Sequence, residues 1–427
     1  MKLTRVFAFM ALAGLAGSAF ATNGMFSHGY GMKSKGMAGA STASSDDAFG
    51  GANNPASAAF AGNRLDLGVD LFSPRRDTER TGSNFGGFAD GSVDSDANYF
   101  LIPEIGYNRM VSDSLALGVT VYGQGGMNTD YESGQINCGA GPANMLCGSG
   151  ALGVDLMQLI IAPTAAFKVA PNHSIGVSPL LGYQKFAATG LQSFAGISSD
   201  TTGATVTNAG NDDAFGYGLR IGYMGKITPT VTIGAAYSTK VDFQEFDKYK
   251  GLFAEQGNLD LPENYNLGVA WQVTPALKLA ADYQRINYSG VNAIGNPSAN
   301  SLAGNPAMAM GTDNGSGFGW SDMDIWKLGA EFKLNQQMIL RAGYSYADSP
   351  IDGSAVGEAT FNIIAPGVIE HHITLGMTYT TATGDEMTVA YMHGFENEVS
   401  GTNPFFGGTD TTTMYQNSLG FQYSWKM

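Results

Sequence analysis

The chain has 427 residues, of which 44% are hydrophobic and only 14% are charged, and its mean hydropathy is −0.06. Soluble domains usually carry roughly 25% charged residues, and a bundle of membrane helices has a large apolar excess, so the composition excludes both. The formal net charge is −15 and no basic stretch with interleaved aromatic residues occurs, which excludes nucleic acid as a partner. The 59 glycines, 24 phenylalanines and 19 tyrosines are typical of strands and turns.

Residues 1–21 are predicted to be a signal peptide. Lys2 and Arg5 precede a short apolar stretch, and a small-x-small cleavage site ends at Ala21. Cleavage there removes both basic residues and changes the formal charge to −17. No later window approaches the roughly 20 uninterrupted apolar residues of a spanning helix. We therefore expect an exported chain that does not cross a bilayer as helices.

Residues 22–63 precede the first predicted strand and lack strand periodicity. Large apolar side chains mix with glycines in residues 22–32, and short capped turns are predicted at 44–49 and 53–56. If the following strands close into a wide barrel, their own side chains cannot fill its lumen. This segment is therefore predicted to be a hatch that plugs the lumen, the alternative being a periplasmic arm.

From residue 64 onward, segments of about ten residues alternate with period two, the signature of a transmembrane β-barrel. In residues 64–73, leucine and valine occupy one face and aspartate and glycine the other, as expected for a lipid side and a lumen side. The predicted strands lie at 64–73, 99–110, 115–125, 155–169, 174–187, 215–226, 231–242, 264–273, 277–288, 323–334, 338–347, 371–381, 386–395 and 415–426.

Short polar connections alternate with long ones of about twenty residues rich in Gly, Asn, Asp and Ser. A β-sandwich or a β-propeller has no reason to show this asymmetry, whereas outer-membrane barrels keep short turns inside and long loops outside. The predicted fold class is all-β: a 14-stranded antiparallel transmembrane β-barrel at 64–427 with an N-terminal hatch. The predicted location is the outer membrane of a Gram-negative bacterium, as a multi-pass barrel.

The two cysteines, Cys138 and Cys147, flank a glycine-containing stretch in one long loop. In an oxidising compartment we expect them to form a disulfide, the alternative being two unpaired loop thiols. The five histidines have no ligand spacing that would add to this pair. No metal and no cofactor are predicted.

Six short motifs resemble segments of one family in the same order and at similar spacing. They are Asn54-Pro55-Ala56, Leu261-Pro262-Glu263, Leu328-Gly329, Arg341-Ala342-Gly343, Asp348-Ser349-Pro350 and Tyr391-Met392-His393-Gly394. With them, the mature chain resembles the FadL family of outer-membrane transporters for long-chain fatty acids and other hydrophobic compounds. The first motif is similar to the family's NPA motif in the hatch.

The resemblance implies a transport path: capture on a hydrophobic groove between outer loops, transfer to a pocket inside the barrel, displacement of the hatch N-terminus, and lateral exit through the wall. The implied partners are hydrophobic small molecules, outer-membrane lipid and the barrel-assembly machinery. The implied ligand-binding residues of the hatch are Thr22, Asn23, Gly24, Met25 and Phe26. The implied lateral gate, at the kink of the third strand, is Tyr122, Gly123, Gly125 and Gly126.

The loops at 188–214 and 243–263 carry large apolar residues that would line the outer groove, unless the loops pack on one another as a lid. These residues are Leu191, Phe194, Tyr249, Leu252 and Phe253. Lys185 is the only basic residue predicted to contact a cargo carboxylate, and it has an alternative role as the partner of an acidic residue in the lumen.

Long-chain fatty acids are the predicted cargo, with neutral aromatic hydrocarbons as the alternative and a general aqueous porin as a less favoured one. An enzyme is not predicted. A serine and a histidine are easily found in this chain, but His393 has Met392 and Gly394 rather than a polar orienting group as neighbours.

Overall fold

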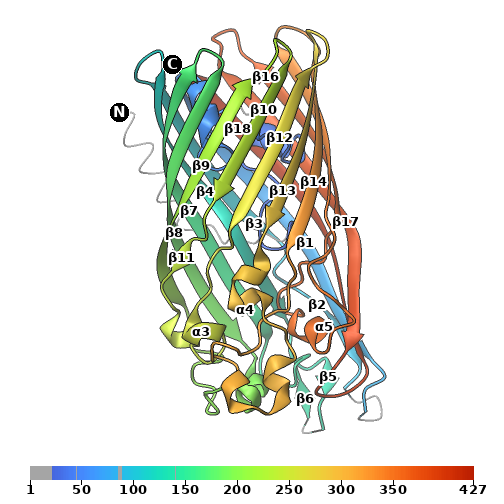
Figure 1. Cartoon of the computed structure of the whole chain (residues 1–427). Helices are drawn as coiled ribbons and strands as arrows, with labels where there is room; N and C mark the ends of the chain where they lie inside the picture. Colours follow the sequence, from blue (N-terminus) through green and yellow to red (C-terminus); the bar gives the residue numbers. More distant parts are fainter. Residues whose placement is uncertain (1–21, 45, 85–88, 140) are drawn as a thin grey trace.

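The computed structural model describes residues 22–44, 46–84, 89–139 and 141–427, so the predicted signal peptide lies outside it. Fourteen antiparallel strands of the described chain form a closed barrel, because β1 (Arg64–Thr81) pairs with β18 (Thr409–Lys426) on one side and with β3 (Phe100–Met110) on the other (Figure 1). Within the described residues, no helix has the length and apolar character needed to cross a membrane.

The other barrel strands follow one another around the wall in chain order. They are β4 (Leu115–Tyr131), β7 (Leu152–Ala170), β8 (His173–Thr189), β9 (Asp212–Lys226), β10 (Val231–Ser238), β12 (Asn264–Gln272), β13 (Leu277–Ile286), β14 (Met323–Lys333), β15 (Met338–Tyr346), β16 (His371–Thr380) and β17 (Glu386–Thr402). Short strands outside this order are β2 (Gly91–Asp94), β5 (Ile136–Asn137), β6 (Pro142–Ala143) and β11 (Asp242–Phe243).

Helices are few and short. The hatch segment contains α2 (Met32–Lys35) and η1 (Pro55–Ala59). The long loops contain η2 (Gln192–Ile197), η3 (Asp247–Tyr249), α3 (Ala254–Gly257), η4 (Tyr288–Gly290), α4 (Asn292–Gly295), η5 (Asn300–Ala303), η6 (Pro306–Met308) and α5 (Glu358–Phe361).

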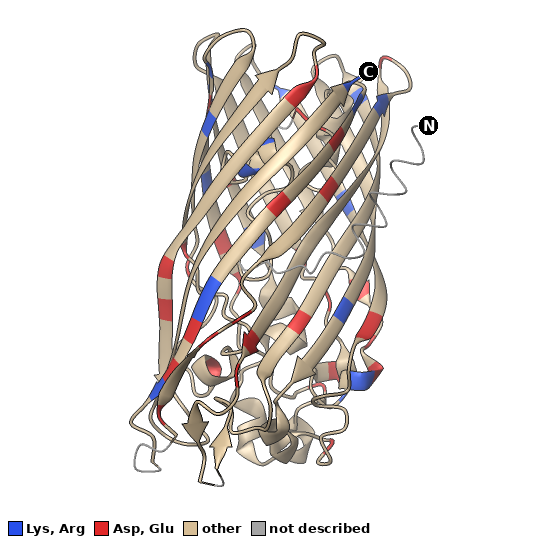
Figure 2. Ribbon diagram, turned by 180° about the vertical axis from the view of Figure 1, so that it is seen from behind, with Lys and Arg blue, Asp and Glu red and all other residues tan. Residues whose placement is uncertain are grey.

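The period-two pattern sorts side chains between lipid and lumen. Along β18, Leu419 and Phe421 are 54% and 45% exposed on the outer face, whereas Gln416 and Gln422 are fully buried in the lumen. Charged residues are sparse along the strands (Figure 2). Apolar side chains therefore cover the surface that contacts lipid, as a transmembrane barrel requires.

The two ends of the barrel differ. Short turns and the C-terminus lie at the top of Figure 1, and the long loops with α3, α4 and α5 gather at the bottom. All fourteen predicted strands are confirmed, but β1, β4, β17 and β18 extend well past their predicted outer ends. The extension of β1 contains Pro-Arg-Arg-Asp-Thr-Glu-Arg, which is polar on both faces and therefore has no hydrophobic periodicity.

Residues 22–43 and 47–59 are buried inside the barrel (Figure 1). Met32 and Phe49 are fully buried, and inward-facing glycines give the segment room. A Cβ on Gly222 of β9 would lie 2.1 Å from Asn54 Oδ1, and one on Gly176 of β8 would lie 2.3 Å from the Pro55 carbonyl carbon. The wall is thus shaped around the hatch backbone.

Candidate functional site: an interrupted wall closed from inside

The barrel wall is interrupted between β3 and β4. Their pairing runs from Met110–Ala116 to Ile105–Val121 and stops there. Among the described residues, 100–104 of β3 then pair with β1 and 122–129 of β4 with β7, but the two segments do not pair with each other. We call the space between these two segments the wall gap.

A β-bulge starts the wall gap on β4. The register with β7 shifts between Gly123 and Gly125, so Gln124 is the extra residue, and the fully buried Tyr122 precedes it. Bulges and glycines bend a strand and weaken its pairing. At the outer end, a bridge between Ser95 and Tyr131 closes the wall again. The gap therefore coincides with the predicted lateral gate.

The free edge of β4 is covered from inside the barrel. Phe26 forms a β-bridge with Gly125, and Tyr30 Oη donates a 3.2 Å hydrogen bond to the Gln124 carbonyl. The guanidinium of Arg76, from β1, donates to the carbonyl of Asn128. Backbone groups without partners are very unfavourable in a membrane wall. The inner contacts thus provide the partners that β3 does not.

The hatch N-terminus, residues 22–26, is held by one tyrosine. Tyr288 Oη donates to the Asn23 carbonyl at 2.6 Å and accepts from the Met25 N–H at 3.0 Å. Its ring contacts Phe26 edge-on, with 6.1 Å between centroids, and Trp320 packs against its other side at 5.1 Å. Burial raises the pKa of Tyr288, which keeps the hydroxyl neutral and able to donate. Tyr288 therefore acts as a clamp on the hatch N-terminus.

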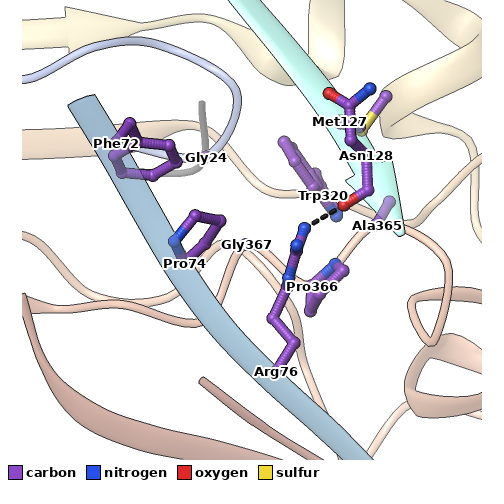
Figure 3. Close-up of a pocket in the computed structure, with 10 residues that line it drawn as sticks. All are labelled: Gly24, Phe72, Pro74, Arg76, Met127, Asn128, Trp320, Ala365, Pro366 and Gly367. Carbon is purple, nitrogen blue, oxygen red and sulfur yellow. Dashed lines mark hydrogen bonds between the residues drawn. The ribbon is translucent and has the colours of Figure 1, made fainter. Parts of the chain in front are cut away.

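A small cavity adjoins this clamp and the wall gap (Figure 3). Its volume is about 10 Å³, room for about one water molecule, and Arg76 is the one charged residue in its lining. The lining residues are Gly24, Phe72, Pro74, Arg76, Met127, Asn128, Trp320, Ala365, Pro366 and Gly367. We call it the inner cavity.

An apolar outer cavity of about 30 Å³ lies under the long loops, and Met127 lines both cavities. Phe194, Leu252 and Phe253 from the predicted groove line it, together with Phe186, Phe318 and Phe361 among others. Leu191 and Tyr249 are also fully buried and belong to the same apolar cluster. The five residues are thus covered rather than exposed, which is the lid arrangement.

The middle of the hatch is anchored by its NPA motif. Asn54 Nδ2 donates to the carbonyls of Thr42 at 2.8 Å and Tyr223 at 3.0 Å, and Asn54 Oδ1 accepts from the Ala56 N–H at 3.1 Å. Pro55 begins the short helix η1, where a missing N–H costs nothing. Ser174 of β8 donates to the Ala56 carbonyl at 2.8 Å. The motif thus connects the hatch to β8 and β9.

Buried ion pairs add to this anchor. Lys35 Nζ lies 2.8 Å from both Asp70 of β1 and Glu104 of β3, and Lys33 Nζ lies 2.9 Å from Glu386 of β17. Burial alone would lower the pKa of Lys35, but the two carboxylates raise it above its usual value. Lys35 is therefore a fixed cation between the hatch and the wall.

A family model described as "Outer membrane protein transport protein (OMPP1/FadL/TodX)" matches residues 9–424, nearly the whole chain. The chain belongs to this family. FadL/TodX proteins transport hydrophobic compounds across the outer membrane, which is consistent with the 14-stranded barrel in a Gram-negative outer membrane. No curated protein sequence matches the chain.

Solved structures of low sequence identity share the fold. The Pseudomonas putida toluene transporter TodX is 19% identical, with a TM-score of 0.70 over 94% of this chain and 99% of that one. A Pseudomonas aeruginosa FadL homologue is 15% identical, with a TM-score of 0.68 over 94% and 99%. The Ralstonia pickettii toluene transporter TbuX is 17% identical, with a TM-score of 0.63 over 94% and 99%. These relatives are transporters rather than enzymes.

In this FadL/TodX chain, Lys185 does not lie on the face of β8 that its predicted role requires. Lys185 is on β8 as expected, but the burial pattern of β8 puts Gln184 and Phe186 in the lumen and Lys185 on the outer face. Adjacent strand residues point to opposite faces, so Lys185 cannot share the lumen with Phe186. The prediction that it contacts a cargo carboxylate is wrong.

The disulfide between Cys138 and Cys147 is present. Within the described residues, no group of three or more His, Cys, Asp or Glu side chains is placed to hold a metal ion.

Sequence reasoning missed Tyr288, Trp320 and Arg76. The first two lie in a loop between β13 and β14, where no periodicity marks a residue that turns inward. Arg76 lies in the polar extension of β1, which we did not predict as strand. The adjacent Arg75-Arg76 pair was a usable signal, because alternation in a strand must turn one of them inward.

Proposed function

We propose that this FadL/TodX protein moves hydrophobic compounds from the outer cavity to the inner cavity and releases them sideways through the wall gap. An apolar solute partitions out of water onto apolar surface, and the two cavities share Met127 as a common wall. Lateral release delivers such a solute to lipid rather than to the periplasmic water. Long-chain fatty acids and neutral aromatic hydrocarbons both suit the apolar lining.

The observation that carries the proposal is that the wall gap is covered by the hatch N-terminus rather than by a strand. Residues 22–26 have few anchors apart from Tyr288 and the bridge to Gly125. Moving them uncovers the edge of β4 and joins the inner cavity to the gap. The hatch N-terminus is thus proposed to act as the movable cover, and Tyr122, Gly123, Gly125 and Gly126 to form the opening.

Deleting Gln124 tests the lateral exit. The deletion removes the extra residue of the bulge, so β4 can continue its regular pairing with β3 and close the gap. We expect uptake of a labelled fatty acid or of toluene by cells that produce the variant to fall at least tenfold, with normal barrel assembly.

The matched control is deletion of Val169, the extra residue where the β7–β8 register shifts between Lys168 and Ala170 at the periplasmic end. It should leave uptake unchanged. Full uptake by an assembled Gln124 deletion would rule out lateral exit at this gap. Deleting residues 22–26 gives a second test: it should alter uptake without preventing assembly.

A further inference from the structure

Three segments of the chain separate the outer cavity from the inner cavity. Met127 of β4 lines both cavities, whereas the adjacent residues Ile364 and Ala365 line the outer and the inner one, respectively. In the same way, Phe318 lines the outer cavity and Trp320 the inner one. Met127, Trp320 and Ala365 face the inner cavity together in Figure 3. We call the three segments the partition; it consists of β4 and of parts of two long loops.

The partition leaves no passage for a cargo molecule. The inner and outer cavities have volumes of about 10 and about 30 Å³. A single benzene molecule needs an apolar cavity of about 150 Å³. One of the three segments must therefore move before even one aromatic ring can pass from the outer to the inner cavity.

One segment of the partition is free of strand pairing. β4 pairs with β7 over its whole length, apart from the bulge, and is the fixed side. Residues 357–369, which we call the inserted loop, belong to the connection between β15 and β16 and are all buried. Within the described chain, this loop pairs with no strand. Its attachment to the wall therefore depends on packing and on individual hydrogen bonds.

Asn362 joins the inserted loop to the other loop of the partition. Its Oδ1 accepts from Trp320 Nε1 at 2.6 Å, and its Nδ2 donates to the carbonyls of Phe318 at 2.7 Å and Glu358 at 2.9 Å. Both amide hydrogens and the amide oxygen of this buried side chain thus have partners. Because Phe318 faces one cavity and Trp320 the other, Asn362 fixes the loop directly at the partition.

Two hydroxyl groups of β4 hold the other side of the inserted loop. Thr129 Oγ1 donates to the Ile364 carbonyl at 3.0 Å, and Tyr131 Oη donates to the Ile363 carbonyl at 3.0 Å. All these bonds join neutral groups, unlike the ion pairs of the hatch body. Neutral hydrogen bonds are individually weak, which suits an element that opens reversibly.

Resting on the transport path proposed above, we propose that the inserted loop is a second gate, which opens between the outer and the inner cavity, and that Asn362 is its latch. Displacing the loop moves Ile364 and Ala365 away from Met127 and joins the two cavities. An apolar compound then passes from one apolar lining to the next without meeting water.

The second gate also contacts the cover of the wall gap. Trp320, which donates to the latch, packs edge-on against the Tyr288 clamp with 5.1 Å between ring centroids. A Cβ on Gly367 would lie 3.1 Å from the Trp320 ring and 3.4 Å from Gly24 Cα of the hatch N-terminus. Movement of the inserted loop therefore removes support from the hatch N-terminus, so the two gates open in sequence.

The test uses one cysteine reporter in each cavity. Ala293→Cys reports on the outer cavity and Ala365→Cys on the inner one. The native cysteines form a disulfide and do not compete. Labelling by N-phenylmaleimide, a thiol reagent with one aromatic ring, is followed on the purified full chain in a neutral detergent. We expect the outer reporter to react at least tenfold faster than the inner one; equal rates would mean that the partition is no barrier and overturn the inference.

Asn362→Ala should accelerate labelling of the inner reporter roughly tenfold and leave the outer reporter within twofold, because it removes three hydrogen bonds of the closed loop. Tyr131→Phe keeps the ring, removes one bond and should give a smaller acceleration. An unchanged inner rate in both variants overturns the inference. Equal acceleration at both reporters also overturns it, since that would mean a general loosening of the long loops.

Asn296→Ala is the matched control. Asn296 Nδ2 also donates to two loop carbonyls, those of Gly315 at 2.8 Å and Asp313 at 3.2 Å, but Asn296 lines neither cavity. Its substitution should change neither rate. Acceleration of the inner reporter as large as in Asn362→Ala would show that the effect is not specific to the latch and overturn the inference.

Repeating the measurement with Gln124 deleted separates this gate from the lateral exit. The acceleration by Asn362→Ala should persist with the wall gap closed, because the reagent arrives from the outer cavity. Its loss there would mean that the reagent enters through the gap, which overturns the second gate and leaves the lateral opening intact. If the outer reporter of the unchanged protein is not labelled at all, the proposed transport path fails together with the inference.

Discussion

The hatch has two regions that are held in different ways. The hatch N-terminus, residues 22–26, contacts aromatic rings and is clamped by the hydroxyl of Tyr288. The hatch body, residues 31–57, is joined to the wall by buried ion pairs and by Asn54. Breaking a buried ion pair costs about 3–5 kcal/mol, whereas losing one neutral hydrogen bond costs about 0.5–1.5 kcal/mol. One hatch can therefore contain a fixed plug and a movable cover.

The largest expected effect comes from Lys35→Met in the hatch body. It leaves Asp70 and Glu104 buried without their cation, a cost of about 3–5 kcal/mol. We expect the hatch body to undock and the lumen to admit ions, measured as steady current in planar bilayers. Lys333→Met, at an exposed strand end, is the control and should stay closed. A Lys35→Met channel as silent as the unchanged protein would contradict a plug fixed by charge.

A matched pair of glycine substitutions compares the two regions directly. A Cβ at Gly222 would lie 2.1 Å from Asn54 Oδ1, and one at Gly125 would lie 2.4 Å from the Met25 carbonyl. Gly222→Ala should destabilise hatch docking by about 1–3 kcal/mol, because the anchored body cannot move aside. Gly125→Ala should instead displace the hatch N-terminus and change uptake with little effect on docking. Hydrogen exchange at 53–57 reports on docking of the hatch body, and exchange at 22–26 reports on the hatch N-terminus. Equal changes in exchange at the two segments in both variants would contradict a difference in how the two regions are held.

Tyr288→Phe affects the hatch N-terminus alone. It removes the donor to the Asn23 carbonyl and the acceptor for the Met25 N–H, at a cost of about 1–3 kcal/mol. Spin labels or hydrogen exchange at residues 22–26 should report roughly tenfold greater opening, with no change at residues 31–57. Tyr265→Phe, a partly exposed site on β12, serves as the control. Unchanged protection of residues 22–26 would show that the clamp contributes nothing.

A pH dependence of the hatch body is expected as well. Burial, with Asp66 nearby, raises the pKa of Asp47 to about 7. A carboxyl with a raised pKa stabilises docking fully below its unfolded value near 4, and this contribution is lost as the pH rises through about 7. Amide protection at 46–57 should therefore decrease from pH 4 to pH 8, and Asp47→Asn should flatten the profile. If amide protection instead increased from pH 4 to pH 8, protonation of Asp47 would not stabilise docking.

Much of the fold could be predicted because its signal is periodic. Lipid-facing leucines alternate with polar groups that face the lumen, so the number of strands could be predicted. Short turns alternate with long loops, so the direction of the strands could be predicted as well. The position of the bulge on β4 could be predicted because glycines such as Gly123 and Gly125 permit one. The outer ends of β1 and β17 were missed because polar residues occupy both faces there.

The candidate site was less accessible to sequence reasoning. Loop residues such as Tyr288 and Trp320 turn inward through contacts between distant segments, which no local pattern records. The error at Lys185 has a different origin: the strand was predicted correctly, but the residue was assigned to the wrong face of it. Counting alternation from the inward Gln184 places it outside.

The inward-facing glycines also make the wall complementary to one seating of the hatch. Asn54 occupies the space at Gly222 and Pro55 the space at Gly176, so the inner surface of β8 and β9 follows the hatch backbone in this position. β1 follows the hatch directly in the chain and forms the final seam with β18. The strand that closes the barrel is therefore covalently continuous with the segment that fills it, which ties the plug to the seam.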